Sequence, residues 1–210
     1  MQTTSTQALD RLLAGNRRFA AGETRYGQIS RRARSELLAG QQPLAILFGC
    51  VDSRVSPTAI FDVDPGEVLI IRTAGQVLDD AVIASIEFGV DVLDIPLIVV
   101  LGHTHCGAVT AAAQPIDAAP LPGKLGGLID AIRPAVEQAR QADSRQTEEE
   151  VIARAIGLNV QLSMQNLLDS PVIAAAVAAE RVSIVGVVYD LATGAVSEVG
   201  ANEVTASERA

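Results

Sequence analysis

The sequence predicts an α/β fold in which a mainly parallel central sheet is flanked by helices. Apolar runs of strand length alternate with segments of helical periodicity, which is typical of a parallel sheet covered on both faces. The chain has 210 residues, 49% of them hydrophobic and 20% charged, which is enough for one domain with a full core. We therefore expect about four parallel strands and, after the turn at 191–194, an antiparallel edge strand.

Hydrophobic spacing and capping signals place the elements along the chain. Strands are expected at 44–50, 67–72, 96–102, 182–190 and 195–199. Helices are expected at 6–21, 30–39, from 57, 79–90, 106–113, 125–141, 148–168 and from 170. Thr147 and Glu150 form a capping box, Asp79 or Asp80 caps the helix that follows, and Ser56 precedes Pro57 at a helix start. Residues 114–124 contain three prolines and are expected to form a loop.

Charge is distributed unevenly over what we expect to be one domain, residues 1–210, with a helical arm at 1–40. Residues 1–34 carry a net charge of +5 and the rest of the chain −14, which gives −9 in total. This acidity argues against nucleic acid as a partner. The basic arm is expected to lie on acidic surface, either of its own chain or of a partner subunit. A solvated helix face explains the same charges equally well.

Neither a signal peptide nor a membrane span is evident in the sequence. The first residues lack an apolar core segment, and no window approaches 18 uninterrupted apolar residues. We therefore expect a cytoplasmic protein that does not bind membranes. Thiols stay reduced in the cytoplasm, so the two cysteines are better candidates for metal binding or catalysis than for a disulfide.

All the cysteines and histidines lie in two stretches, "GCVDSRV" at 49–55 and "LGHTHCGAV" at 101–109. Each stretch follows a predicted strand, and the carboxyl ends of parallel strands meet at one edge of a sheet. Cys50, His103 and Cys106 should therefore converge, with Cys106 at a helix start that favours its thiolate. Two thiolates and one imidazole suit zinc, and a fourth position left for water or a carboxylate is typical of a catalytic site.

Asp52 and Arg54 lie two residues apart on an extended segment and should face the same way. Arg54 can then hold Asp52 in a bidentate pair, and Asp52 can accept a hydrogen bond from metal-bound water. Released from Arg54, Asp52 could instead occupy the fourth metal position. On its own, Cys50 reads as a small buried hydrophobe, and the Asp–Arg pair as a surface ion pair of ~0–1 kcal/mol. The coincidence of all these residues at one edge favours a metal site.

The two stretches resemble the β-class carbonic anhydrases, in "CVDSRV" and "GHTHCGAV". Further matches are "GNRRF" at 15–19, "IRTAG" at 71–75, "SIEFGV" at 85–90 and "GVVYDLATG" at 186–194. The resemblance implies a lyase that reversibly hydrates carbon dioxide to bicarbonate and a proton, with one zinc ion per chain. It implies Cys50, His103 and Cys106 as zinc ligands, and the pair Asp52–Arg54 as the dyad that orients zinc-bound hydroxide.

The resemblance also implies a substrate pocket and an assembly. The family's pocket positions map to Gln41, Ala74, Phe88 and Gly107. Homodimers or homotetramers are expected, with the amino-terminal helix packing on a neighbour. Thr73 stands where the family commonly has Asn, and Phe88 where it commonly has Tyr.

Some family members hold an inhibitory bicarbonate between a Trp, an Arg and a Tyr. Arg72 and Tyr189 could fill two of these places, but Leu47 stands at the Trp position, which argues against such control here. Two further functions stay open at this point: hydrolysis of carbon disulfide by the same scaffold, and a non-enzymatic zinc-binding or thiol-sensing module. His105 could carry protons to buffer, or be a surface residue with no such role.

Overall fold

The computed structural model describes residues 3–25, 35–115, 121–142 and 145–199, and its centre is a five-stranded sheet. The strands are β1 (Ala45–Cys50), β2 (Val68–Thr73), β3 (Leu97–His103), β4 (Ser183–Tyr189) and β5 (Val196–Glu198). Their order is β2-β1-β3-β4-β5; the first four are parallel, and β5 pairs antiparallel with β4. This confirms the predicted fold class, including the edge strand.

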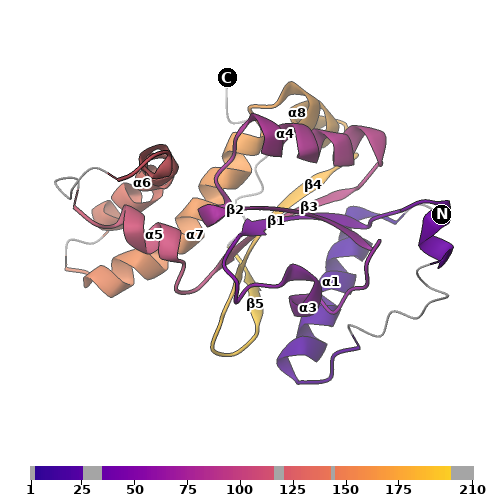
Figure 1. Cartoon of the computed structure of the whole chain (residues 1–210), viewed down its shortest axis with the longest axis horizontal. Helices are drawn as coiled ribbons and strands as arrows, with labels where there is room; N and C mark the ends of the chain where they lie inside the picture. The colour runs from indigo at the N-terminus through magenta and orange to yellow at the C-terminus, as the bar shows by residue number, and fades with distance from the viewer. Residues whose placement is uncertain (1–2, 26–34, 116–120, 143–144, 200–210) are drawn as a thin grey trace.

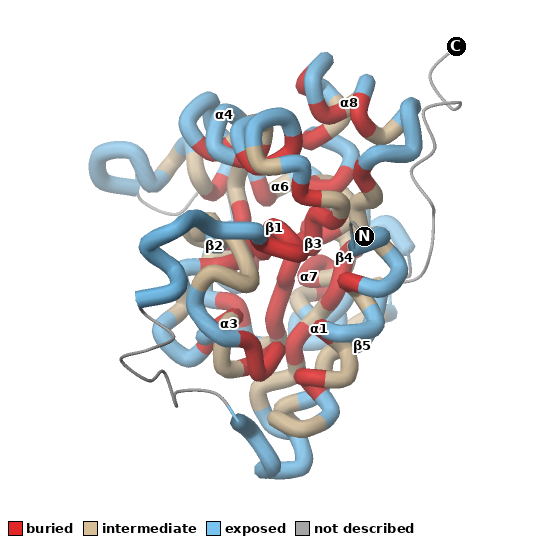
Figure 2. The backbone as a smooth tube through the Cα atoms, turned by 90° about the vertical axis from the view of Figure 1, so that its right-hand side faces the viewer, coloured by how far each residue is buried: buried red, intermediate tan, exposed pale blue. Residues whose placement is uncertain are grey.

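Helices cover both faces of the sheet (Figure 1). One face packs against α1 (Ser5–Ala20) and α3 (Pro57–Ile60); the other packs against α4 (Asp80–Glu87), α7 (Glu148–Leu167) and α8 (Pro171–Ala178). Successive side chains of a strand point to opposite faces. Accordingly, Leu47 and Val99 join the first core, and Ile46 and Ile98 join the second. The central strands β1 and β3 are buried throughout (Figure 2).

A third apolar cluster lies between α7 and two further helices, α5 (Gly107–Ala112) and α6 (Leu125–Ala142). These helices project to one side of the sheet in Figure 1. The cluster includes Cys50 and Cys106 together with Val109 and Ile132. Two cysteines from distant parts of the chain are therefore buried in one place, at the carboxyl end of β1.

The helix ends follow the predicted capping signals, with one difference. Thr147 and Glu150 form the capping box, and the side chain of Asp79 accepts a hydrogen bond from the amide of Val82. Ser56 occupies the N-cap position before Pro57, but its side chain makes no capping hydrogen bond. After α4, the chain continues in a π-helical turn, η3 (Phe88–Val92), so this helical segment ends two residues later than predicted.

Two of the three arginines of α1 contact acidic residues of their own chain. Arg11 pairs with Glu67, and Arg18 Nε lies 2.5 Å from Asp62 Oδ2. Ala8 and Leu12 bury the other side of α1 in the first core. Packing of this arm on a partner subunit stays a prediction. After the arm, a short 3₁₀ helix η1 (Leu37–Ala39) is described, whereas most of the predicted helix 30–39 lies outside the described residues.

In the described part of the chain, no helix combines the length and the apolar character needed to cross a membrane.

Candidate metal centre

Three potential metal ligands meet at the carboxyl ends of two neighbouring strands. Cys50 is the last residue of β1, His103 the last of β3, and Cys106 the N-cap of α5. Their ligand atoms all lie within 4.8 Å of one another, and the two sulfur atoms are 4.0 Å apart. All three residues are buried. The topology therefore brings together the residues that the sequence predicts to converge.

The hydrogen bonding of His103 leaves one ring nitrogen free to bind a metal. Nδ1 lies 2.9 Å from the carbonyl oxygen of Thr104 and must donate its hydrogen, because a carbonyl only accepts. Nε2 then carries the lone pair, and it is buried with no hydrogen-bond partner. An orphaned buried nitrogen beside two sulfurs fits a cation, and a backbone acceptor on the other nitrogen is the usual support of a metal-binding imidazole.

The two thiols differ in acidity, and Cys50 is the more acidic of the two. The pKa of Cys50 is lowered, chiefly by its hydrogen bond with the Cys106 thiol; the Gly75 amide, whose nitrogen is 3.3 Å from the sulfur, adds to the effect. The pKa of Cys106 is raised, chiefly by the same interaction with Cys50. The backbone amides at the start of α5 lower it, as expected from the helix position, but Cys50 outweighs them. A soft set of two sulfurs and one imidazole suits zinc.

Asp52 and Arg54 form the bidentate pair that their spacing predicts. Arg54 Nε lies 3.0 Å from Asp52 Oδ1, and Nη2 lies 2.7 Å from Oδ2. These hydrogen bonds are the main cause that holds the pKa of Asp52 well below its usual range. Asp52 Oδ2 is 3.9 Å from His103 Nε2, so the carboxylate lies beside the cluster while it stays engaged by Arg54.

Arg54 also joins the two loops that carry the candidate ligands, because its Nη2 donates to the carbonyl oxygen of His105 at 3.1 Å. His105 has a φ of 56°, in the left-handed region, which is uncommon for residues other than glycine. Its side chain is exposed.

Arg72 is a candidate bicarbonate-binding residue in the sequence, but in the structure its side chain binds main-chain oxygen atoms. Its Nε and Nη2 donate to the carbonyl oxygens of Cys50 and Asp52, each at 2.7 Å. The guanidinium therefore fixes the backbone that presents both residues. The Tyr189 ring packs against Phe19, with ring centroids 6.2 Å apart, and Leu47 is fully buried.

The residues expected to line a substrate pocket lie in different surroundings. Ala74 begins the turn η2 (Ala74–Gln76), next to the residue that contacts Cys50, and Gly107 directly follows Cys106. Phe88 is half exposed and lines a groove with side chains of β2 and α4. Gln41 is exposed, just after η1.

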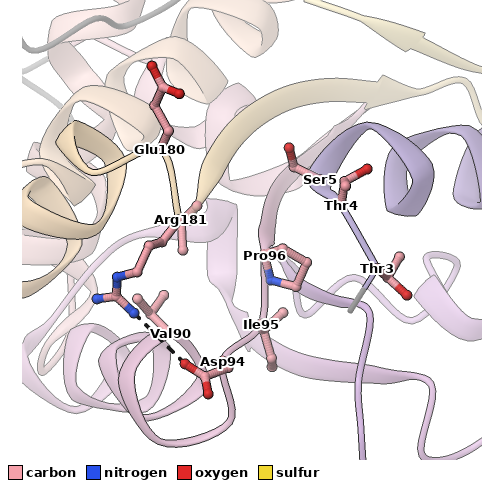
Figure 3. Close-up of a pocket in the computed structure, with 10 residues that line it drawn as sticks. Thr3, Thr4, Ser5, Val90, Asp94, Ile95, Pro96, Glu180 and Arg181 are labelled. Carbon is pink, nitrogen blue, oxygen red and sulfur yellow. Dashed lines mark ion pairs between the residues drawn. The ribbon is translucent and has the colours of Figure 1, made fainter. Parts of the chain in front are cut away.

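A cleft of about 360 Å³ lies at the opposite end of the sheet, at the amino ends of β3 and β4 (Figure 3). Hydroxyl groups from the start of α1 line one side. On the other side Arg181 lies 3.9 Å from Asp94. This cleft contains neither a thiol nor an imidazole, so the chemistry of the chain is concentrated at the other end.

Sequence reasoning missed a buried polar network behind the cluster. Asn159 Nδ2 donates to the carbonyl oxygen of Gly75 at 2.9 Å, and Ser163 Oγ lies 3.2 Å from that of Gln76. Asn159 and Ser163 are four residues apart on the buried face of α7. The sequence signal for such a network is a pair of polar residues four positions apart within an apolar helix face.

The fold and the buried cluster define an α/β protein with a candidate metal centre at the carboxyl edge of its sheet. A family model described as "Carbonic anhydrase" matches residues 45–196. "Carbonic anhydrase 2" of Mycobacterium tuberculosis is 40% identical over 193 residues, 91% of each chain, and a carbonic anhydrase of Mycolicibacterium smegmatis is 39% identical over 183 residues, 87% of each. Among solved structures, one of two tetrameric β-carbonic anhydrases of Sordaria macrospora is similar to this chain, with a TM-score of 0.75 at 26% identity. The match covers 92% of this chain and 97% of that one.

The chain therefore belongs to the β-carbonic anhydrase family and is an enzyme. This excludes the non-enzymatic module that the sequence left open.

Proposed function

We propose that this enzyme reversibly hydrates carbon dioxide to bicarbonate and a proton, with one zinc ion per chain. The observation that carries the proposal is the buried cluster of Cys50, His103 and Cys106, in which His103 Nε2 has no partner. The names of the relatives support the reaction. These three residues would hold the ion and leave a fourth position open, as catalytic zinc sites do.

Bound zinc would supply Lewis acidity, which lowers the pKa of water and makes it a nucleophile near neutral pH. Asp52 would orient that nucleophile. Because Arg54 keeps its pKa low, Asp52 is an ionised acceptor throughout the neutral range. An ionised carboxylate only accepts hydrogen bonds, so Asp52 favours a bound water or hydroxide oxygen that still carries a hydrogen. It would therefore direct the O–H towards itself and leave a lone pair for attack on carbon dioxide.

Arg54 and Arg72 would preserve this arrangement. The Arg54 side chain is half exposed, yet it donates two hydrogen bonds to the Asp52 carboxylate and one to the carbonyl oxygen of His105. Arg72 holds the main chain on both sides of Val51. We further propose that the family's pocket positions contact the substrate, and that the enzyme acts as a homodimer or homotetramer. The pocket positions are Gln41, Ala74, Phe88 and Gly107. The tetrameric state described for the Sordaria macrospora enzymes supports the assembly.

We also propose a cytoplasmic location. Cys50 and Cys106 are free thiols with sulfurs 4.0 Å apart, and a reducing compartment would keep them available as ligands.

The test is the variant Asp52→Asn, compared with Asp130→Asn on the exposed surface of α6. Zinc per chain is measured by elemental analysis, and carbon dioxide hydration by stopped flow. We expect D52N to keep its zinc and to lose activity by at least about 100-fold, because the amide no longer acts only as an acceptor. D130N should match the wild type.

Full activity in D52N would remove the role given to Asp52. A wild-type protein without stoichiometric zinc, or without hydration activity, would refute the proposed function as a whole. Supplying carbon disulfide in the same assay decides between the two substrates that the sequence left open.

A further inference from the structure

The turn η2 has a backbone conformation that needs support. Gly75 has φ 61°, and the next residue, Gln76, has φ 46° although it carries a side chain. A left-handed conformation is unfavourable for a residue with a Cβ atom, which here is Gln76. The space around Gly75 is also closed: an added Cβ would lie 2.6 Å from Ile132 Cδ1 and 3.0 Å from Ala108 Cβ. The surrounding structure must therefore hold this turn in place.

Helix α7 supplies that support. Asn159 is 2% exposed, and its amide donates to the carbonyl oxygen of Gly75 at 2.9 Å. The Ser163 hydroxyl lies 3.2 Å from the carbonyl oxygen of Gln76 and 2.9 Å from that of Asn159, and can donate to one of them at a time. A buried amide that binds the Gly75 carbonyl fixes the peptide group that joins Gly75 to Gln76, and so restrains Gly75 itself.

The fixed turn directs one donor at the cluster. The amide nitrogen of Gly75 is 3.3 Å from the sulfur of Cys50, and this contact is buried. A hydrogen bond to a thiolate withdraws electron density from the sulfur, and such outer contacts tune the metal that the sulfur binds. The path thus runs from Asn159 to the peptide after Gly75, across the Gly75 Cα, and through the preceding peptide amide to the sulfur of Cys50.

We propose that Asn159 is a positioning residue of the metal centre, which holds the Gly75 amide on the sulfur of Cys50. Ser163 assists by holding the following peptide. This inference rests on the proposed zinc site. Asn159 acts through the turn and not by binding the ion: it keeps in place the donor that stabilises and orients the Cys50 thiolate, and thereby strengthens the affinity for the ion.

The test replaces Asn159 with leucine, which has a similar size and no donor. Asn16→Leu is the matched control, because Asn16 is also buried at 4% exposure and binds two carbonyl oxygens, those of Ile60 and Gly194, at 3.2 and 2.9 Å. Each protein is loaded with Co²⁺, and its thiolate-to-cobalt charge-transfer band is recorded. Zinc affinity is then measured by competition with a chelator.

We expect N159L to shift the charge-transfer band to lower energy and to weaken zinc binding by about 10–100-fold. A sulfur that loses its hydrogen bond gives up an electron more easily, which explains the direction of the shift. N16L should lose thermal stability and keep the wild-type band. If N159L does not fold, Asn159→Ala serves instead, since alanine fits any helix interior.

An unchanged band together with zinc affinity within about twofold of the wild type, in whichever Asn159 variant folds, overturns this inference alone. A wild-type protein that takes up neither cobalt nor zinc overturns the proposed function as well. The two failures are therefore distinguishable.

Discussion

Asp190 directly follows β4, whose last residue, Tyr189, pairs with His103 of β3. Its Oδ1 accepts hydrogen bonds from the amides of Ala192 and Thr193, at 2.9 and 2.7 Å, and from the Thr193 hydroxyl at 2.9 Å. These bonds, the Thr193 amide first, lower the pKa of Asp190. One carboxylate thus shapes the turn that leads into β5.

The lowered pKa predicts a pH dependence of stability. Because the folded pKa lies below the unfolded one, the stabilisation is fully present above the unfolded carboxyl pKa and is lost as pH falls through the folded value. In Asp190→Asn the side-chain oxygen still accepts these bonds but does not titrate. Between about pH 5 and pH 3, the wild type should therefore lose more stability than D190N, measured as urea midpoints. Parallel curves would contradict the assignment.

At the scale of elements, helix α7 lies on the sheet because two strands have glycine where it crosses. A Cβ atom at Gly102 of β3 would lie 2.5 Å from Val160 Cγ2, and one at Gly186 of β4 would lie 2.7 Å from Val160 Cγ1. Val160 is fully buried on α7 and lies three residues before Ser163. The same close approach brings Asn159 to the turn η2.

The variant Gly102→Ala should therefore destabilise the fold by about 1–3 kcal/mol, because the β-branched Val160 has little freedom to move away. Val160→Ala alone also destabilises, by leaving a cavity. The double variant should be more stable than the sum of the two predicts, with a coupling of about 0.5–3 kcal/mol in chemical denaturation. Additive effects would show that α7 does not depend on this contact.

The elements and the convergence of Cys50, His103 and Cys106 could be predicted from the sequence because their signals are local. Apolar runs marked the buried strands, and the position of Cys50 and His103 directly after such runs placed both at one edge. The spacing of Asn159 and Ser163 marks them as buried polar residues, but their partner Gly75 could not be predicted, because it lies 84 positions from Asn159 and the contact depends on how α7 crosses the sheet. The clamp of Arg72 on two carbonyl oxygens likewise leaves no mark in the side-chain pattern.

At the scale of the whole molecule, one edge of the sheet presents apolar side chains. Strand β2 is an edge strand in this chain, and its Ile70 and the neighbouring Phe88 are 36 and 50% exposed. An unpaired strand edge with exposed apolar residues favours association. This surface therefore supports the proposed assembly of two or four chains.

The variant Phe88→Glu should reduce the assembly to smaller species, because a charge would be buried in the interface. Its matched control is Leu125→Glu on α6, where the replaced side chain is likewise 50% exposed. Molar mass in solution is measured by light scattering after size-exclusion chromatography. A wild-type mass equal to one chain, or an F88E mass equal to that of the wild type, would refute this prediction.

The proposed ligands Cys50 and Cys106 stand 56 positions apart in the chain, on segments that continue the two central strands. An ion bound there would fasten the middle of the sheet, so its binding energy would count towards folding. Scarcity of zinc in a cell would then do more than idle the enzyme: unloaded copies would open more often and be degraded by proteases. The supply of one trace element would thus govern how much of the protein is present.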